Sequence, residues 1–132
     1  LEVCSQATDK FMEMIGMDVD FIKSTNESYF TVETHIRHIN EAKEGMKIIA
    51  KTQVLEGKGK KLRLFHILET DNGVIVATGE HMLLHVSLKT RSSCFPSEKI
   101  EKNLLKFAEE HSTLSWPEGA GRAIGNRFPK VL

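Results

Sequence analysis

Six histidines raise the question of a metal site. His81 and His85 stand four residues apart in a strand-like run, which places them on one face about 13 Å apart, too far for one zinc ion. His35 and His38 are three residues apart in another strand-like run, so they point to opposite faces. We therefore interpret the histidines as polar groups on a hydrated sheet or as hydrogen-bonded core residues, and we expect no metal site.

Serine, cysteine and glycine motifs give little support to a nucleophile or a nucleotide site. Ser5 and the segment Ser92-Ser93-Cys94 lack the strand–Gly-x-Ser-x-Gly–helix pattern that exposes a nucleophile. The tail Gly-Ala-Gly-Arg-Ala-Ile-Gly (119–125) misses the dinucleotide-binding spacing by one residue and follows no βαβ unit. We expect no bound cofactor.

Carboxylates inside strand-like runs are the remaining candidates. Glu33 and Glu80 are unusual there, because glutamate is depleted in strands. Glu33 shares its expected face with Tyr29 and His35, and the opposite, core face is expected to carry Phe30, Val32, Thr34 and Ile36. Two interpretations of Glu33 stay open: a solvated outer face, or the polar wall of a pocket at a subunit boundary.

The elements that must position these side chains begin with a helix over residues 3–15. Its apolar stripe recurs at helical spacing and comprises Cys4, Thr8, Phe11, Met12 and Ile15. Gly16 can end the helix in a left-handed conformation. A stripe this wide needs a large apolar cover, so we expect a sheet to curl around the helix.

Four strand-like runs follow a polar connection over 17–28 that holds a possible helical turn at 20–23. They cover residues 29–39, 46–55, 62–70 and 74–88. Gly57-Lys58-Gly59-Lys60 and Asp71-Asn72-Gly73 predict hairpin turns. Ser97 is expected to cap a second helix with an apolar stripe of Ile100, Leu104, Phe107 and Ala108, before a coil-like tail. This order predicts an α+β protein with an antiparallel meander.

The amino-acid composition limits the kinds of protein to which this sequence can belong. The 132 residues are 40% hydrophobic, enough for one domain with a core. Lysine plus arginine (18) equals aspartate plus glutamate (18), which argues against nucleic-acid binding through a broad basic surface. No apolar run approaches the roughly 20 residues of a membrane span, and no signal peptide is visible. Cys4 and Cys94 are expected to be free thiols, as in a cytoplasmic protein.

Five segments together resemble one group of small acyl-CoA thioesterases with the hot-dog fold. They are Tyr-Phe-Thr-Val-Glu-Thr-His-Ile-Arg-His-Ile (29–39), Thr-Gln-Val-Leu-Glu-Gly (52–57), Leu-Arg-Leu-Phe-His (62–66), Ala-Thr-Gly-Glu-His-Met-Leu-Leu-His-Val (77–86) and Trp-Pro-Glu-Gly-Ala-Gly-Arg-Ala-Ile-Gly (116–125). This group accompanies, or is fused to, bacterial L-carnitine dehydrogenases and is associated with betainyl-CoA hydrolysis. The resemblance implies a single hot-dog domain over residues 1–132, an antiparallel sheet wrapped around a central helix with a C-terminal helix. The family's N-terminal strand and loop are expected to be missing from this sequence.

The resemblance also implies hydrolysis of an acyl-CoA thioester, with betainyl-CoA of carnitine breakdown as the specific substrate. A carboxylate would activate water or attack directly, and backbone N–H groups at the start of the central helix would stabilise the oxyanion. The family's acidic segment before this helix is absent, so the catalytic residue is expected upstream of Leu1 and the oxyanion donors are expected at or before Leu1. Two alternatives stay open: a non-hydrolytic acyl-CoA-binding or dehydratase-like hot-dog protein, and a structural partner domain of a dehydrogenase.

The implied substrate adds candidate binding residues. CoA phosphates favour arginine, which makes Arg91 and Arg122 candidates. A quaternary ammonium favours aromatic faces and a carboxylate, so Tyr29, Glu33 and Trp116 form a candidate cage. Ordinary surface arginines, a structural tryptophan and an outward-facing Glu33 are the alternatives.

The expected partners follow from the long strand over residues 29–39. Two subunits are expected to pair these strands edge to edge in a homodimer, alone or within a dimer of dimers, because the strand would otherwise be an aggregation-prone edge. A carnitine dehydrogenase is a further candidate partner. No nucleic acid or membrane is expected as a partner.

Overall fold

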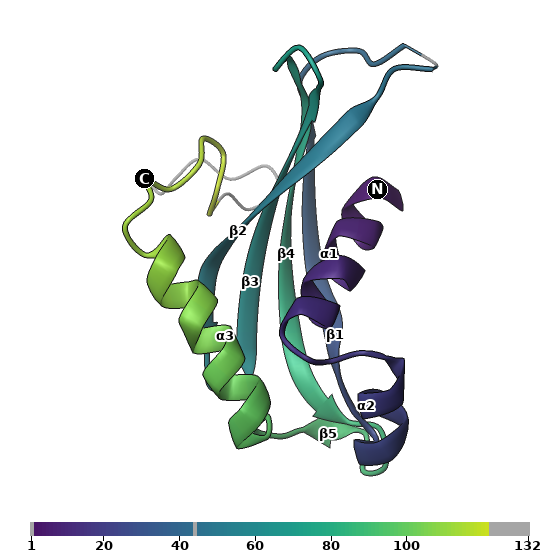
Figure 1. Cartoon of the computed structure of the whole chain (residues 1–132), viewed down its shortest axis with the longest axis vertical. Helices are drawn as coiled ribbons and strands as arrows, with labels where there is room; N and C mark the ends of the chain where they lie inside the picture. The colour runs from purple at the N-terminus through teal and green to yellow at the C-terminus, as the bar shows by residue number, and fades with distance from the viewer. Residues whose placement is uncertain (1, 44, 122–132) are drawn as a thin grey trace, which may run out of the picture.

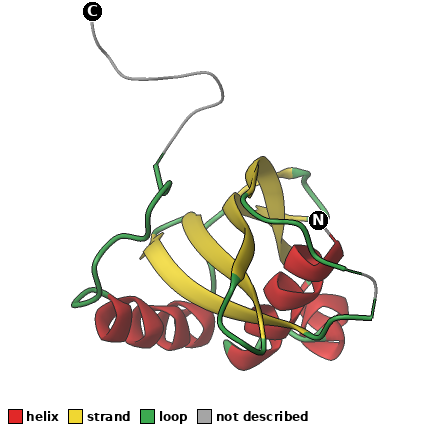
Figure 2. Ribbon diagram, turned by 90° about the horizontal axis from the view of Figure 1, so that it is seen from above, coloured by secondary structure: helices red, strands yellow, loops and turns green. Residues whose placement is uncertain are grey.

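A curled antiparallel sheet lies over the helices in the computed structural model, which describes residues 2–43 and 45–121 (Figures 1 and 2). The elements in chain order are α1 (Glu2–Met14), α2 (Val19–Thr25), β1 (Glu27–His38), β2 (Ile48–Lys58), β3 (Lys61–Thr70), β4 (Ile75–Ser87), β5 (Ser92–Ser93) and α3 (Glu98–His111). The predicted α+β class, with an antiparallel sheet wrapped around the first helix and a helix after it, is confirmed.

The sheet has the strand order β1–β4–β3–β2, and the short β5 pairs with the end of β4. All pairings are antiparallel. The two predicted hairpins join β2 to β3 and β3 to β4. Strand β1 pairs with β4 and not with β2, so the predicted meander holds for β2, β3 and β4 but is wrong for β1. The chain crosses over between β1 and β2, and these two strands become the edges of the described sheet (Figure 1).

Helix α1 begins and ends within one residue of the predicted limits. Cys4, Thr8 and Phe11 are its buried residues, as the stripe predicts, and Ile15 just beyond it is fully buried. Gly16 follows at φ 94°, a left-handed conformation that glycine adopts without steric cost.

The connection after α1 is more regular than expected, because it contains the seven-residue helix α2. Asp18 caps this helix, accepting a hydrogen bond from the Phe21 N–H at 2.8 Å. Asn26 ends it in the left-handed conformation at φ 58°. The chain is thereby directed into β1.

The core lies between the sheet and the two longer helices. Its main cluster contains Phe11, Ile15, Met17, Tyr29, Val54, Leu62, Leu64, Leu83, Ile100 and Leu104. The rings of Phe11 and Phe107 meet edge to face at 5.4 Å, which joins α1 to α3. Helix α3 packs along β2 so closely that a Cβ on Gly57 would lie 3.0 Å from Leu104 Cγ. A side chain at position 57 would therefore have to displace Leu104 by a few tenths of an ångström.

The residues of β1 that face the core differ from the prediction because this strand contains a β-bulge. Tyr29 pairs with His85 and Thr31 with Leu83, but Glu33 pairs with Met82, which leaves Val32 as an extra residue. The extra residue shifts the alternation by one, so Phe30 and Val32 are exposed (50% and 57%) whereas Tyr29 is buried. The prediction that Phe30 and Val32 face the core is wrong, and so is the prediction that Tyr29 and Glu33 share a face.

Cys4 and Cys94 are free thiols, as expected. Among residues 2–43 and 45–121, no helix has the length and apolar character needed to cross a membrane.

Candidate functional site

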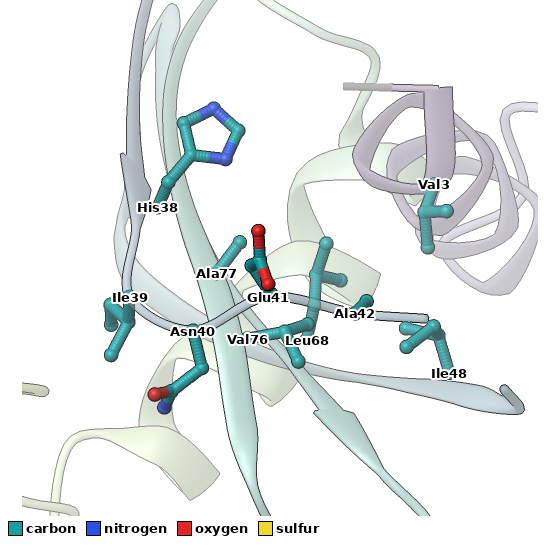
Figure 3. Close-up of a pocket in the computed structure, with 10 residues that line it drawn as sticks. All are labelled: Val3, His38, Ile39, Asn40, Glu41, Ala42, Ile48, Leu68, Val76 and Ala77. Atoms are coloured by element: carbon teal, nitrogen blue, oxygen red, sulfur yellow. The ribbon is translucent and has the colours of Figure 1, made fainter. Parts of the chain in front are cut away.

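A pocket of about 530 Å³ lies beside the first turn of α1, at the end of the sheet where β1 finishes (Figure 3). Its lining comes from α1, the end of β1 with the following loop, and the facing parts of β2, β3 and β4: Val3, His38, Ile39, Asn40, Glu41, Ala42, Ile48, Leu68, Val76 and Ala77. Most of these side chains are apolar, and the volume is typical of a small-molecule site. The pocket suits a small acyl group.

Hydrogen bonds fix the loop that forms the outer wall of this pocket. The backbone N–H groups of Ile39 and Asn40 both donate to the Val76 carbonyl, at 2.9 and 3.1 Å. The Asn40 side chain donates to the Ile75 carbonyl at 2.7 Å. The loop is thereby held against the start of β4, and it places the Glu41 carboxylate in the pocket lining (Figure 3).

The first turn of α1 contributes Val3 to the wall of this pocket (Figure 3). Val3 adds an apolar side chain to a lining that is already largely apolar, so the helix contributes hydrophobic surface to the pocket.

A buried network of histidines and threonines extends along the inner face of the sheet below α1. His66 bonds to Thr8 at 2.9 Å and to Thr52 at 2.8 Å, so both of its ring nitrogens have partners. His81 bonds to Thr34 at 3.0 Å, and its ring lies 5.3 Å from that of His66. The interpretation of these histidines as hydrogen-bonded core residues holds for His66; His81 Nε2 is buried without a hydrogen-bond partner among the described residues.

Burial keeps both imidazoles of this network neutral. It lowers the pKa of His66 to about 4, and the nearby His81 adds to the effect. Burial also lowers the pKa of His81, against the opposing charge of Glu80. Neutral rings of this kind position their neighbours and do not carry positive charge at neutral pH.

A smaller pocket of about 250 Å³ opens between α1 and β1, next to His81. It is lined by Ser5, Thr8, Asp9, Thr31, Thr34 and His81. Ser5 and Asp9 are four residues apart on α1 and therefore lie on one face of the helix. This spacing is the one sequence signal that could have revealed the pocket, and its polar lining is suited to water or a polar group.

Tyr29, the first predicted cage residue, is part of the core. Its ring meets His85 edge to face at 5.0 Å, and burial, with the charge of Glu101 adding to it, raises the pKa of Tyr29 to about 12. Glu33 is exposed on the opposite face of β1. One chain therefore does not bring Tyr29 and Glu33 together.

Trp116, the third predicted cage residue, lies over the outer face of the sheet. The Arg63 guanidinium stands 5.7 Å from the Trp116 ring, and it also pairs with Glu80 at 2.8 Å. Glu80 accepts a further hydrogen bond from the Gly121 N–H at 2.7 Å. The Trp116 ring thus already contacts the Arg63 guanidinium of its own chain. The segment over residues 116–121 is held against β3 and β4 by this contact and by the hydrogen bond from Gly121 to Glu80.

The two predicted CoA-binding arginines are placed differently. Arg91 is exposed in the turn after β4, with a left-handed backbone at φ 60°, at the opposite end of the sheet from the pocket beside α1. Arg122 lies outside the described residues. The structure does not bring Arg91 to the pocket within one chain.

Comparison with known proteins places the chain in a family. Residues 1–122 match the family model described as the thioesterase-like superfamily. A Ruegeria pomeroyi protein named L-carnitine dehydrogenase/betainyl-CoA thioesterase is 54% identical over 125 residues, which are 94% of this chain and 25% of that protein. The chain thus spans about a quarter of that relative. A Pseudomonas aeruginosa protein named betainyl-CoA thioesterase is 40% identical over 127 residues, 95% of this chain and 79% of that protein.

Solved structures agree with this family. A Staphylococcus aureus protein in complex with CoA superposes with a TM-score of 0.86 at 22% identity, over 92% of this chain and 77% of that one. A putative thioesterase from Pseudomonas putida gives a TM-score of 0.73 at 30% identity, over 94% and 78%. With the fold, the family model and these relatives in agreement, the chain belongs to the thioesterase-like superfamily of hot-dog proteins.

Proposed function

We propose that the protein hydrolyses an acyl-CoA thioester, and that its substrate is betainyl-CoA, which yields betaine and CoA in carnitine breakdown. The observation that carries this proposal is the match to the Pseudomonas aeruginosa betainyl-CoA thioesterase, which covers most of both chains. The pocket of about 530 Å³ beside α1 supports it, because its largely apolar lining can hold a small acyl group.

The proposed reaction needs two groups around the thioester carbonyl. A carboxylate takes a proton from water as the water oxygen attacks the carbonyl carbon. We propose that backbone N–H groups at the N-terminal end of the central helix, at or before Leu1, stabilise the oxyanion. The C–S bond then breaks, and the CoA thiolate leaves and is protonated. We propose that the carboxylate lies upstream of Leu1, in the acidic segment that the family carries before this helix.

Recognition of the betainyl group needs negative charge near the quaternary ammonium. Glu41 supplies a carboxylate in the lining of the pocket beside α1. Tyr29, Glu33 and Trp116 are weaker candidates as a joint cage, because Tyr29 is buried on one face of β1 and Glu33 is exposed on the other. We propose Glu41 as the group that favours the cationic acyl chain.

The CoA moiety of the substrate carries phosphates that need cations. Arg91 is exposed and free to meet such a phosphate, and Arg122 remains a second candidate. We propose both as CoA-binding residues. Replacement of Arg91 by alanine is then expected to raise KM for CoA substrates.

The assembly that we propose is a homodimer formed along β1, alone or within a dimer of dimers. Strand β1 spans twelve residues at an edge of the described sheet, and Phe30 and Val32 are exposed on it. An uncovered edge of this length is a template for pairing with a second strand.

A carnitine dehydrogenase is the proposed functional partner. The Ruegeria pomeroyi relative is named for both activities, and this chain matches a quarter of its length. The proposed compartment is the cytoplasm, which the two free thiols favour.

The test is the release of free CoA thiol from betainyl-CoA by the purified full-length protein. Steady thiol release at many turnovers per chain supports the proposal. CoA binding without thiol release would favour the non-hydrolytic hot-dog protein, and co-purification with a dehydrogenase without any acyl-CoA binding would favour the structural partner domain.

A further inference from the structure

Three potential metal ligands lie side by side at the end of the sheet opposite the pocket beside α1. Glu27 begins β1, His85 is near the end of β4, and Cys94 directly follows β5. One donor atom from each, a carboxylate oxygen, an imidazole nitrogen and a thiol sulfur, lies within 4.8 Å of the other two. Figure 1 shows β5 beside the end of β4, at the end of the sheet where α2 leads into β1.

The backbone explains why these three side chains meet. His85 lies opposite Tyr29 in the pairing of β1 with β4. Glu27 is two residues before Tyr29 in β1, so the side chains of Glu27, Tyr29 and His85 lie on the same face of the sheet. On the other side of β4, the Cys94 N–H donates to the His85 carbonyl at 3.0 Å. His85 is therefore the central residue of a row that crosses three neighbouring segments, spaced about 4.8 Å apart.

His85 has one ring nitrogen whose hydrogen-bonding needs are met and one whose needs are not. Its side chain is fully buried, and Nδ1 donates to the Cys94 carbonyl oxygen at 2.9 Å. Nε2 is buried with no hydrogen-bond partner among the described residues and faces the Glu27 carboxylate at 3.7 Å. In the neutral ring Nε2 carries a lone pair, so two acceptors face each other and a cation between them would stabilise both.

We propose that Glu27, His85 and Cys94 bind a zinc ion. Imidazole, thiolate and carboxylate are the ligands that zinc takes in proteins, and three of them leave the fourth tetrahedral position open to water. Zinc binding displaces the proton of the Cys94 thiol, whose pKa is raised by burial and by the Glu27 carboxylate, against the opposing charge of Lys60.

The three side chains are already in contact in the described structure: the Cys94 thiol lies 3.5 Å from His85 Nδ1, and the Glu27 carboxylate lies 3.7 Å from His85 Nε2. A zinc ion would replace these weak contacts with metal–ligand bonds. Zinc uses all three side chains. It would also tie the start of β1 to β4 and to the segment after β5, and so stabilise this end of the sheet. This site goes beyond the proposed thioester hydrolysis and does not depend on it.

The test is equilibrium dialysis of the untagged full-length protein, freed of metal by chelator, against zinc chloride, with bound zinc measured by mass spectrometry. We expect one zinc per chain with a dissociation constant of about 1 μM or tighter. Cobalt substitution should give a thiolate-to-metal charge-transfer band. Zinc should also raise the thermal unfolding midpoint.

Two ligand variants and two matched controls locate the site. Cys94→Ser and Glu27→Gln should each weaken zinc binding at least tenfold, and Cys94→Ser should abolish the cobalt band. Zinc binding should be unchanged in the two control variants. Cys4→Ala removes the other thiol, and Glu33→Gln changes another glutamate of β1. Both ligand side chains are partly exposed, so these variants are expected to fold, which circular dichroism checks. No zinc binding by the wild-type protein, or equal binding by both ligand variants and the controls, would overturn the proposal.

Discussion

The buried imidazole of His66 makes the stability of the protein depend on pH. Its pKa is about 4 in the folded protein and about 6.5 in an unfolded chain, so the unfolded state binds more protons between these values. The free energy of unfolding should therefore be highest above pH 6.5 and fall as the pH drops toward 4, by up to about 3 kcal/mol.

Urea unfolding at several pH values between 7 and 4.5 measures this effect. A His66→Gln variant should lose the part of this pH dependence that comes from His66 and keep the part that comes from His81, whose pKa burial also lowers. His38→Gln, which changes an exposed histidine, should retain all of it. Equal pH dependence in the wild type and His66→Gln would show that other groups are responsible.

Glu41 is expected to contribute part of the preference for a cationic acyl chain. In Glu41→Gln the ratio of kcat/KM for betainyl-CoA to that for a neutral analogue with a tert-butyl group should fall by about two- to fivefold, as for an exposed charge pair. Trp116→Ala is the control, since the Trp116 ring already lies over Arg63. If this ratio of kcat/KM values fell in Trp116→Ala and not in Glu41→Gln, the quaternary ammonium would be bound by Trp116 and not by Glu41.

At the scale of elements, periodicity in the sequence was enough to place α1, α3 and the four long strands, but not the short elements α2 and β5. The stripe Cys4, Thr8 and Phe11 identified α1, and β-branched runs with two turn signals identified the hairpins. The bulge at Val32 left no signal, because an extra residue in a strand is decided by its pairing partner and not by its own type.

The candidate sites were harder to predict than the elements. The pocket beside α1 brings Val3 close to residues 38–42 and 76–77. Strand pairing alone brings together the three side chains of the proposed zinc site, Glu27, His85 and Cys94. A search for histidine pairs could not find a site with a single histidine. Arrangements of this kind depend on which strands become neighbours, which the local sequence does not encode.

The contact between β2 and α3 gives an element-scale prediction. A Gly57→Ala variant places a methyl group 3.0 Å from Leu104 Cγ, so it should destabilise the protein by about 1–3 kcal/mol in urea unfolding. Leu104→Ala creates space at the same point. The double variant should therefore be more stable than the sum of the two single changes implies, and simple additivity would refute this packing.

At the scale of the whole molecule, the exposed edge of β1 predicts a dimer. Light scattering of the full-length protein at micromolar concentration should give twice the mass of one chain, or four times for a dimer of dimers. Val32→Lys places a charge on the exposed face of β1 and should shift the equilibrium toward monomer, while Val19→Lys, at an exposed position on α2, should not. A monomeric wild type would contradict edge pairing.

The proposed hydrolysis of betainyl-CoA is tested most directly by a comparison of two substrates on the full-length protein. We expect kcat/KM for betainyl-CoA to exceed that for the neutral tert-butyl analogue at least tenfold, which corresponds to about 1.4 kcal/mol of differential binding in the transition state. Equal values would contradict betainyl specificity and leave a general acyl-CoA thioesterase, and the absence of thiol release from either substrate would contradict hydrolysis itself.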